Sequence, residues 1–158
     1  MERIMAAKFG TKMLIKIDPN CKYYSQYKCR KDEIEKCGKL YSQIYNSHPV
    51  PSTGMHFFQL KIVRLSFQSV TVGLITSRNF HQQYSRDKSH CICFDAYTHS
   101  TYVEGTKTDL QVEVKLNDVI RTVVNIPNAT VHWYINHDFI SEAIIPSHMA
   151  AMPLYPYL

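Results

Sequence analysis

The sequence has no hydrophobic run long enough to cross a bilayer, and its N-terminus lacks the apolar stretch of a secretory signal. None of its apolar runs approaches the ~20 residues that a membrane-spanning helix requires. The first eight residues carry charges at Glu2, Arg3 and Lys8, where a signal peptide would need an apolar region. We therefore expect an intracellular, cytoplasmic protein without a membrane span.

Glycine and tryptophan are scarce, and cysteine occurs in an odd number. The 158 residues include 5 glycines, 1 tryptophan and 5 cysteines. The glycines form no phosphate-binding loop, and neither a Walker motif nor an HExxH pattern occurs. An odd number of cysteines does not fit a complete disulfide framework, and thiols are the usual state in a reducing compartment. We expect a protein that is not an enzyme.

The residues that are abundant favour a globular β-rich domain. The hydrophobic fraction is 45% and the charged fraction 20%, which excludes a disordered chain. The 11 tyrosines suit the half-buried surfaces of strands. A chain of this length fits one domain with a sizeable core.

The net charge of +5 comes entirely from the first part of the chain. Residues 1–45 contain 10 of the 18 Lys and Arg but only 5 of the 13 Asp and Glu, so the rest of the chain is balanced. The segment 22–31 combines basic residues with three tyrosines and comes closest to a nucleic-acid-binding stripe. We interpret it as a solvated basic flank, so we expect no nucleic-acid partner.

Alternation of apolar and polar residues predicts several strands in the second half of the chain. The strictest alternation runs from Leu110 to Leu116, and Asn117-Asp118 follows as a turn signal. Val119–Ile126 and Thr130–Ile135 are the next predicted strands. The last of them places Trp133 on its apolar face, so we expect Trp133 in the core.

The first half contains three further predicted strands. They are Met55–Val63, Val70–Ile75 and the short Met13–Ile17. Gly73 lies inside the second, where a glycine marks a bulge or the close approach of another backbone. Several short strands separated by turns are typical of a sandwich or a barrel.

The segment 32–45 carries two competing patterns. Its apolar residues have helical spacing, but Gly38 costs a helix about 1 kcal/mol relative to Ala. We expect a strand near Lys39–Tyr45, after one short helical turn near residues 32–38.

Five motifs in order resemble the SPRY (B30.2-like) family over roughly residues 40–158. Gly54–Ile62 resembles the family's Gly-x-His-Tyr-Trp-Glu-Val strand, and Val72–Ile75 its next Ile/Val-Gly-Val strand. Asn117–Ile120 stands at the family's Gly-Asp-Val-Ile, and Val131–Asn136 at its Asn-Gly hairpin. Pro153–Tyr157 is similar to the late Leu-Tyr-Pro motif.

The sequence also departs from the family at several positions, which indicates a divergent member. Phe58 replaces the usual Trp, Asn117 and His137 replace glycines, and Asn125 stands where an Asp is common. The chain ends just after Tyr157, where the family usually adds one more strand. The chain is therefore a divergent member, or it is a fragment, or the last strand is supplied from elsewhere.

The resemblance implies an all-β fold, a bent two-sheet antiparallel β-sandwich. We expect the SPRY-like sandwich over residues 39–158 and an N-terminal extension with the first strand or strands over residues 1–38. Members of the family recognise short segments of partner proteins through loops at one edge of the sandwich. They carry no catalytic machinery and need no cofactor, and many serve in ubiquitin-ligase adaptors or cytoskeletal assemblies.

Two loops combine aromatic and basic residues, the side chains that dominate protein-binding hot spots. The first is residues 77–86 and the second residues 97–102. Surface loops often carry function, so we expect both to contact a partner protein. The predicted partner-binding residues are Arg78, Asn79, Phe80, His81, Tyr84, Arg86, Tyr97 and Tyr102.

The cysteines and histidines raise the alternatives of a zinc site and a cysteine nucleophile. On a strand, Cys91 and Cys93 would face the same side and supply half of a zinc site. The spacing of seven residues between Cys21, Cys29 and Cys37 is not that of a zinc knuckle. We interpret the cysteines as small buried apolar residues and expect no metal.

Two other functions stay open at this stage. The poorly matched N-terminal 38 residues and the missing last strand are consistent with a structural subunit built permanently into a large cytoskeletal, ciliary or ubiquitin-ligase-type assembly. A lectin-like sandwich is the second alternative. Its stacking site would combine Trp133 with His56 and Asn136, which requires an exposed tryptophan ring.

Overall fold

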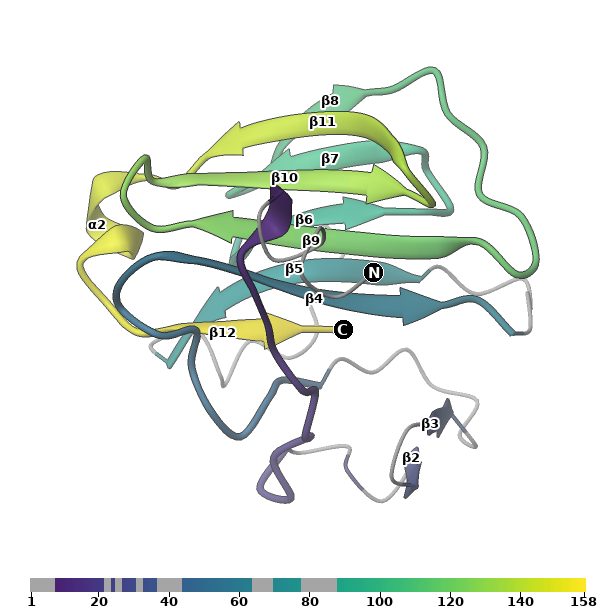
Figure 1. The fold of residues 1–158 in the computed structure, drawn as a ribbon, viewed down its shortest axis with the longest axis horizontal. Coiled ribbons are helices and arrows are strands. Elements are labelled where there is room, and N and C mark those ends of the chain that lie inside the picture. Colours follow the sequence, from purple (N-terminus) through teal and green to yellow (C-terminus); the bar gives the residue numbers. More distant parts are fainter. Residues whose placement is uncertain are drawn as a thin grey trace.

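A computed structural model describes residues 8–21, 24, 27–30, 33–36, 44–63, 70–77 and 88–158. Within these residues two five-stranded sheets lie face to face as a β-sandwich (Figure 1). The first sheet has the order β1 (Thr11–Lys12), β4 (Met55–Lys61), β9 (Val119–Asn125), β10 (Thr130–Ile135), β11 (Asp138–Ile144). The second has the order β12 (Leu154–Tyr157), β5 (Thr71–Thr76), β6 (Cys91–Asp95), β7 (Ser100–Val103), β8 (Thr106–Asp109).

The predicted all-β sandwich is confirmed by this arrangement. All neighbouring strands in the two sheets are antiparallel except β1, which runs parallel to β4. A separate two-stranded sheet joins β2 (Tyr27–Arg30) to β3 (Glu33–Lys36). The described residues also include a one-turn helix, α2 (Ser147–Ala150). No helix in the described ranges is long and apolar enough to traverse a bilayer.

The main core fills the space between the two sheets. Phe58 and Trp133 contribute from the first sheet and Leu74 and Phe94 from the second, each with no exposed surface. Trp133 alternates along β10 with half-buried neighbours, as the period-2 pattern of a strand requires. Its predicted core position is therefore confirmed.

Gly73 on β5 is confirmed as a point where another backbone approaches closely. A Cβ atom built on Gly73 would lie 2.0 Å from the Ile92 carbonyl oxygen and 2.6 Å from the Cys93 Cα. Both of these atoms belong to the neighbouring strand β6, so they cannot move aside without breaking the ladder. Only glycine fits at this position.

The prediction of a strand from Leu110 to Leu116 is wrong. These residues join the two sheets, running from β8 to β9 at the right of Figure 1 without a ladder partner. The alternation is nevertheless real in terms of burial. Leu110 and Val112 pack against the core and Val114 lies in it, while Gln111 and Glu113 are exposed. The pattern records which side faces the core, and it does not specify a hydrogen-bonding partner.

Two predictions near the N-terminus also need correction. The strand expected at Met13–Ile17 lies instead at Thr11–Lys12, and Ile17 forms one isolated bridge with Asn46. The helical turn expected near residues 32–38 is wrong, because Glu33–Lys36 is strand β3, paired with β2. Of the strand expected at Lys39–Tyr45, residues 39–43 lie outside the described residues.

An earlier part of the chain covers the outer edge of β12, after which the chain ends. The Ile44 amide donates to the Leu158 carbonyl oxygen at 2.8 Å and the Leu158 amide returns a bond to Ile44 at 2.9 Å. The amides of Asn46 and Val50 donate to Pro156 and Leu154 at 2.8 and 2.7 Å. Residues 44–50 therefore complete this edge.

Gly73→Ala tests the contact between β5 and β6. We expect the substitution to lower the free energy of unfolding by about 2–3 kcal/mol or more, because the added methyl group meets backbone atoms. Urea denaturation measures the change. Thr106→Ala, at an exposed position of the same sheet, is the matched control. An unchanged midpoint for Gly73→Ala would contradict the close approach.

Candidate functional site

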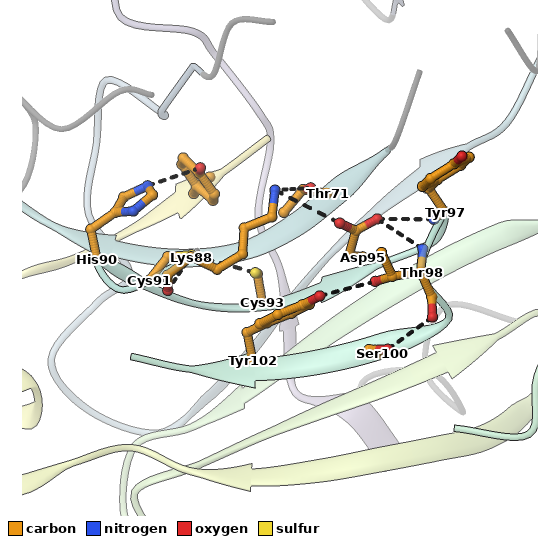
Figure 2. A network of polar contacts seen from close by, with 11 residues as sticks. Thr71, Lys88, His90, Cys91, Cys93, Asp95, Tyr97, Thr98, Ser100 and Tyr102 are labelled. Atoms are coloured by element: carbon orange, nitrogen blue, oxygen red, sulfur yellow. Dashed lines mark hydrogen bonds and ion pairs between the residues drawn. The ribbon is translucent and has the colours of Figure 1, made fainter. Parts of the chain in front are cut away.

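The face of the second sheet turned away from the main core carries a polar network (Figure 2). Side chains alternate along β6, so Ile92 and Phe94 enter the main core while Cys91, Cys93 and Asp95 point to the opposite side. We call this side the outer face of the second sheet. Across the strands, Asp95 lies beside Thr71 of β5 and Ser100 of β7.

A buried ion pair between Lys88 and Asp95 lies at the centre of the network. The Lys88 Nζ is 3.7 Å from the Asp95 Oδ2 and donates to the Thr71 Oγ1 at 3.1 Å. The two charged side chains are only 11% and 5% exposed. Lys88 has a φ of 56°, and its carbonyl oxygen accepts a bond from the Cys91 amide. This left-handed turn directs the Lys88 side chain back across the sheet.

The Asp95 carboxylate also fixes the turn at residues 96–99. Its Oδ1 accepts hydrogen bonds from the Tyr97 amide at 2.9 Å and the Thr98 amide at 3.4 Å. The Thr98 hydroxyl lies 3.3 Å from the Tyr102 hydroxyl. The Ser100 hydroxyl is 2.8 Å from both the Thr98 carbonyl oxygen and the Asp109 carboxylate. A single carboxylate thus links the Lys88 turn to the turn before β7.

The ion pair at the edge of the network, Lys107 with Asp109, is exposed, whereas the central pair is buried. The Lys107 Nζ lies 2.7 Å from the Asp109 Oδ1 at the surface of β8. The hydrogen bond from Lys107 is the main cause that lowers the pKa of the Asp109 carboxyl, and the bond from Ser100 adds to it. The same contact raises the pKa of Lys107. Solvent screens this pair far more than it screens Lys88 and Asp95.

The cysteine pair on this face is buried. The Sγ atoms of Cys91 and Cys93 are 3.4 Å apart, and neither residue is exposed. Burial raises the pKa of the Cys93 thiol well above its usual value, and the hydrogen bond with Cys91 adds to the shift. Such a thiol is a poor nucleophile and a poor ligand. In the described ranges, no three His, Cys, Asp or Glu side chains form a group that could hold a metal ion.

The structure describes two of the eight predicted partner-binding residues. Tyr97 is 67% exposed at the turn that Asp95 fixes, and Tyr102 is half-buried on β7. The other six lie outside the described residues, namely Arg78, Asn79, Phe80, His81, Tyr84 and Arg86. Lys88 comes two residues after the first predicted loop. It contacts Asp95, which lies two residues before the second.

Sequence reasoning missed Lys88, Asp95 and Thr71. The sequence carries a weak indication of the role of Asp95, because an Asp side chain commonly accepts a hydrogen bond from the backbone amide two residues later. Nothing in the sequence indicated the role of Lys88, because its contact with Asp95 depends on a left-handed turn that the sequence does not specify.

A shallow groove of about 640 Å³ lies beside the fixed turn. Thr98 and His99 line one part of it, and Asp109 with residues 110–113 lines the rest. The His99 carbonyl oxygen accepts the Leu110 amide at 2.9 Å, which holds the two parts together. The groove therefore adjoins the turn that carries Tyr97.

The tryptophan site that a lectin would need is not formed. Trp133 is fully buried between the sheets, and His56 is buried with its Nε2 2.6 Å from the Thr53 carbonyl oxygen. A sugar ring cannot stack on an indole that has no exposed surface.

Comparison with solved structures assigns the architecture. The SPRY domain of human HERC1 has a TM-score of 0.63 at 18% identity, and the match covers 90% of this chain and 87% of that domain. The TRIM65 PSpry domain has a TM-score of 0.67 at 12% identity, covering 99% and 90%. The chain has the fold of SPRY domains.

The SPRY fold explains the positions of the sequence motifs. Gly54–Ile62 and Val72–Ile75 fall on β4 and β5, Val131–Asn136 on β10 and Pro153–Tyr157 on β12. The structure of stonustoxin is also similar, with a TM-score of 0.69 at 12% identity. The match covers 94% of this chain but only 26% of the stonustoxin chain. No protein-family model matches the sequence. No curated protein matches it either.

Lys88→Met tests the buried ion pair. We expect the free energy of unfolding to fall by about 3 kcal/mol, because the substitution leaves the Asp95 carboxylate buried without a cation. Lys107→Met is the matched control at the exposed pair, and we expect its midpoint to be nearly unchanged. Chemical denaturation of both variants measures the difference. Equal midpoints for the two would show that Lys88 and Asp95 form no buried pair.

Proposed function

We propose that this chain is a non-enzymatic protein-interaction module that binds a segment of a partner protein through the loops at residues 77–86 and 97–102. The observation that carries the proposal is the Lys88–Asp95 pair. It joins Lys88, two residues after the first loop, to Asp95, two residues before the second. SPRY domains as a family bind proteins, and the shared fold supports the same role by analogy.

The geometry of Tyr97 supports this proposal. Its ring is exposed, while its backbone amide is held by the Asp95 carboxylate. An aromatic side chain on a fixed turn loses little conformational freedom when it binds. Tyrosine supplies a large apolar area and a hydroxyl group at such contacts.

The groove beside Tyr97 is suited to an extended segment. Leu110 and Val112 supply apolar surface, and Asp109 and Thr98 supply polar groups. A partner segment that lies in this groove would contact the turn and the groove lining together.

A permanent subunit of a large assembly is the second candidate. Strand β11 lies at the edge of the first sheet, and its side chains Phe139 and Ile144 are 57% and 70% exposed. A seven-residue edge strand with exposed apolar side chains is a surface that another chain can cover. This candidate predicts binding through β11 and not through the loops.

Quantitative affinity capture from the native cell extract separates the two candidates. The full chain is compared with a triple variant, Arg78→Ala, Phe80→Ala and Tyr84→Ala, and with Tyr97→Ala. Ile144→Ala is the matched variant at the other surface. We expect the partner to be lost in the triple variant, weakened in Tyr97→Ala and retained in Ile144→Ala, because aromatic and Arg side chains dominate binding.

Loss of the partner in Ile144→Ala with full capture by the loop variants would overturn the proposal in favour of the assembly subunit. Full capture by every variant would overturn both candidates. Equal melting temperatures of the variants are the control that separates lost contact from lost folding.

A further inference from the structure

The outer face of the first sheet contains a buried arginine without an acidic partner. Arg121 on β9 is 3% exposed and lies between Gln59 of β4 and Tyr134 of β10. Lys88, the buried cation of the other sheet, is paired with a carboxylate. In the described part of the chain Arg121 forms no such pair.

Every hydrogen-bond acceptor that the described residues offer to Arg121 is neutral. Its Nε and Nη2 donate to the Gln59 Oε1 at 3.2 and 3.1 Å, and its Nη1 donates to the Asn136 carbonyl oxygen at 3.2 Å. Burial lowers the pKa of the Arg121 guanidinium, which remains charged. A buried charge is costly unless an opposite charge compensates it. The site is therefore electrostatically incomplete.

Aromatic rings and a second cation surround this guanidinium. Its central carbon lies 4.5 Å from the ring centroid of Phe9 and 5.7 Å from that of Phe57. The Lys8 Nζ lies 5.0 Å from the Phe9 ring and 5.5 Å from the Tyr134 ring. Two positive charges thus share one aromatic cluster.

The segment that covers Arg121 has a short backbone ladder to the sheet. Phe9 is 2% exposed and comes just before β1, which has only two residues, both exposed. The Met13 amide adds one bond to the Phe57 carbonyl oxygen at 2.7 Å. A short edge strand of this kind opens at low free energy compared with the core strands. Displacing residues 8–12 would break this two-residue ladder and the packing of Phe9 on Phe57, while the ladders among β4, β9 and β10 would remain.

We propose that Arg121 and the rings of Phe57 and Tyr134 form a binding site for an acidic side chain of a partner peptide, and that residues 8–12 cover this site until the peptide displaces them. The peptide carboxylate supplies the negative charge that Arg121 lacks, and an adjacent aromatic side chain takes the place of Phe9. Arg binds a carboxylate through two parallel hydrogen bonds, so the preference is for acid over amide. This site is on the first sheet, whereas Tyr97 of the proposed function lies between β6 and β7 of the second sheet.

Two substitutions are designed to displace residues 8–12 from the site without changing Arg121. Phe9→Ala removes the covering ring. Gly10→Ala acts through the backbone, because Gly10 has a φ of 80° and an added Cβ atom would lie 1.9 Å from the Met55 carbonyl oxygen. Both variants are expected to expose the site by independent routes.

Fluorescence anisotropy on the full chain measures binding of a labelled synthetic peptide that alternates glutamate and phenylalanine. The matched probe carries glutamine in place of every glutamate. We expect Phe9→Ala and Gly10→Ala to bind the acidic peptide roughly tenfold more tightly than the unaltered chain does. We expect the same two variants to prefer it to the glutamine peptide by roughly tenfold or more, the effect of a charge-assisted hydrogen bond.

Arg121 is tested in the opened Phe9→Ala chain. Adding Arg121→Gln should remove the preference for the acidic peptide, and Arg121→Lys, which keeps the charge, should retain part of it. The Gly10→Ala result needs no change at Arg121, so it decides the proposal even if Arg121→Gln fails to fold. Equal binding of the acidic and glutamine peptides by both opened variants would overturn the proposal. An unchanged preference for the acidic peptide in a folded variant with both Phe9→Ala and Arg121→Gln would also overturn it.

Discussion

The ion pair between Lys88 and Asp95 is the interaction on which the arrangement of the candidate site depends. Both groups are nearly excluded from solvent, so removing either one would leave its partner buried without a counter-charge. The Asp95 carboxylate uses one oxygen for Lys88 and the other for the amides of Tyr97 and Thr98. The position of the exposed Tyr97 ring is therefore coupled to Lys88, which precedes strand β6.

The two sheets share one core and have different outer faces. On the second sheet the buried cation Lys88 has a carboxylate, and the network fixes a turn. On the first sheet the buried cation Arg121 has only neutral acceptors among the described residues, and Phe9 covers it. Packing around Trp133 holds both sheets together and leaves both outer faces free to differ. The paired charge of Lys88 stabilises the turn, and the unpaired charge of Arg121 favours the binding of an acidic group.

Much of the fold could be predicted from local patterns. The limits of β10, the core position of Trp133 and the close approach at Gly73 follow from alternation and from the size of one residue. The segment 110–116 could not be predicted correctly, because alternation reports the buried side and a strand also needs a neighbour. The covered edge of β12 was missed since its partner, residues 44–50, is distant in sequence.

The candidate site was only partly predictable for the same reason. Tyr97 was identified because aromatic residues in a polar loop are conspicuous in any sequence. The contact of Lys88 with Asp95 depends on a left-handed turn and on the register between β5 and β6. The deficit at Arg121 is a property of the whole surrounding surface, and no short motif encodes it.

Hydrogen exchange in the Lys88→Met variant tests most directly whether the ion pair holds the Tyr97 turn. The Tyr97 and Thr98 amides bond to Asp95, whereas the amides of β9 and β10 belong to the other sheet. The account predicts faster exchange at Tyr97 and Thr98 with unchanged protection in β9 and β10. Unchanged exchange at Tyr97 and Thr98 in a variant that has lost the Lys88 charge would contradict it.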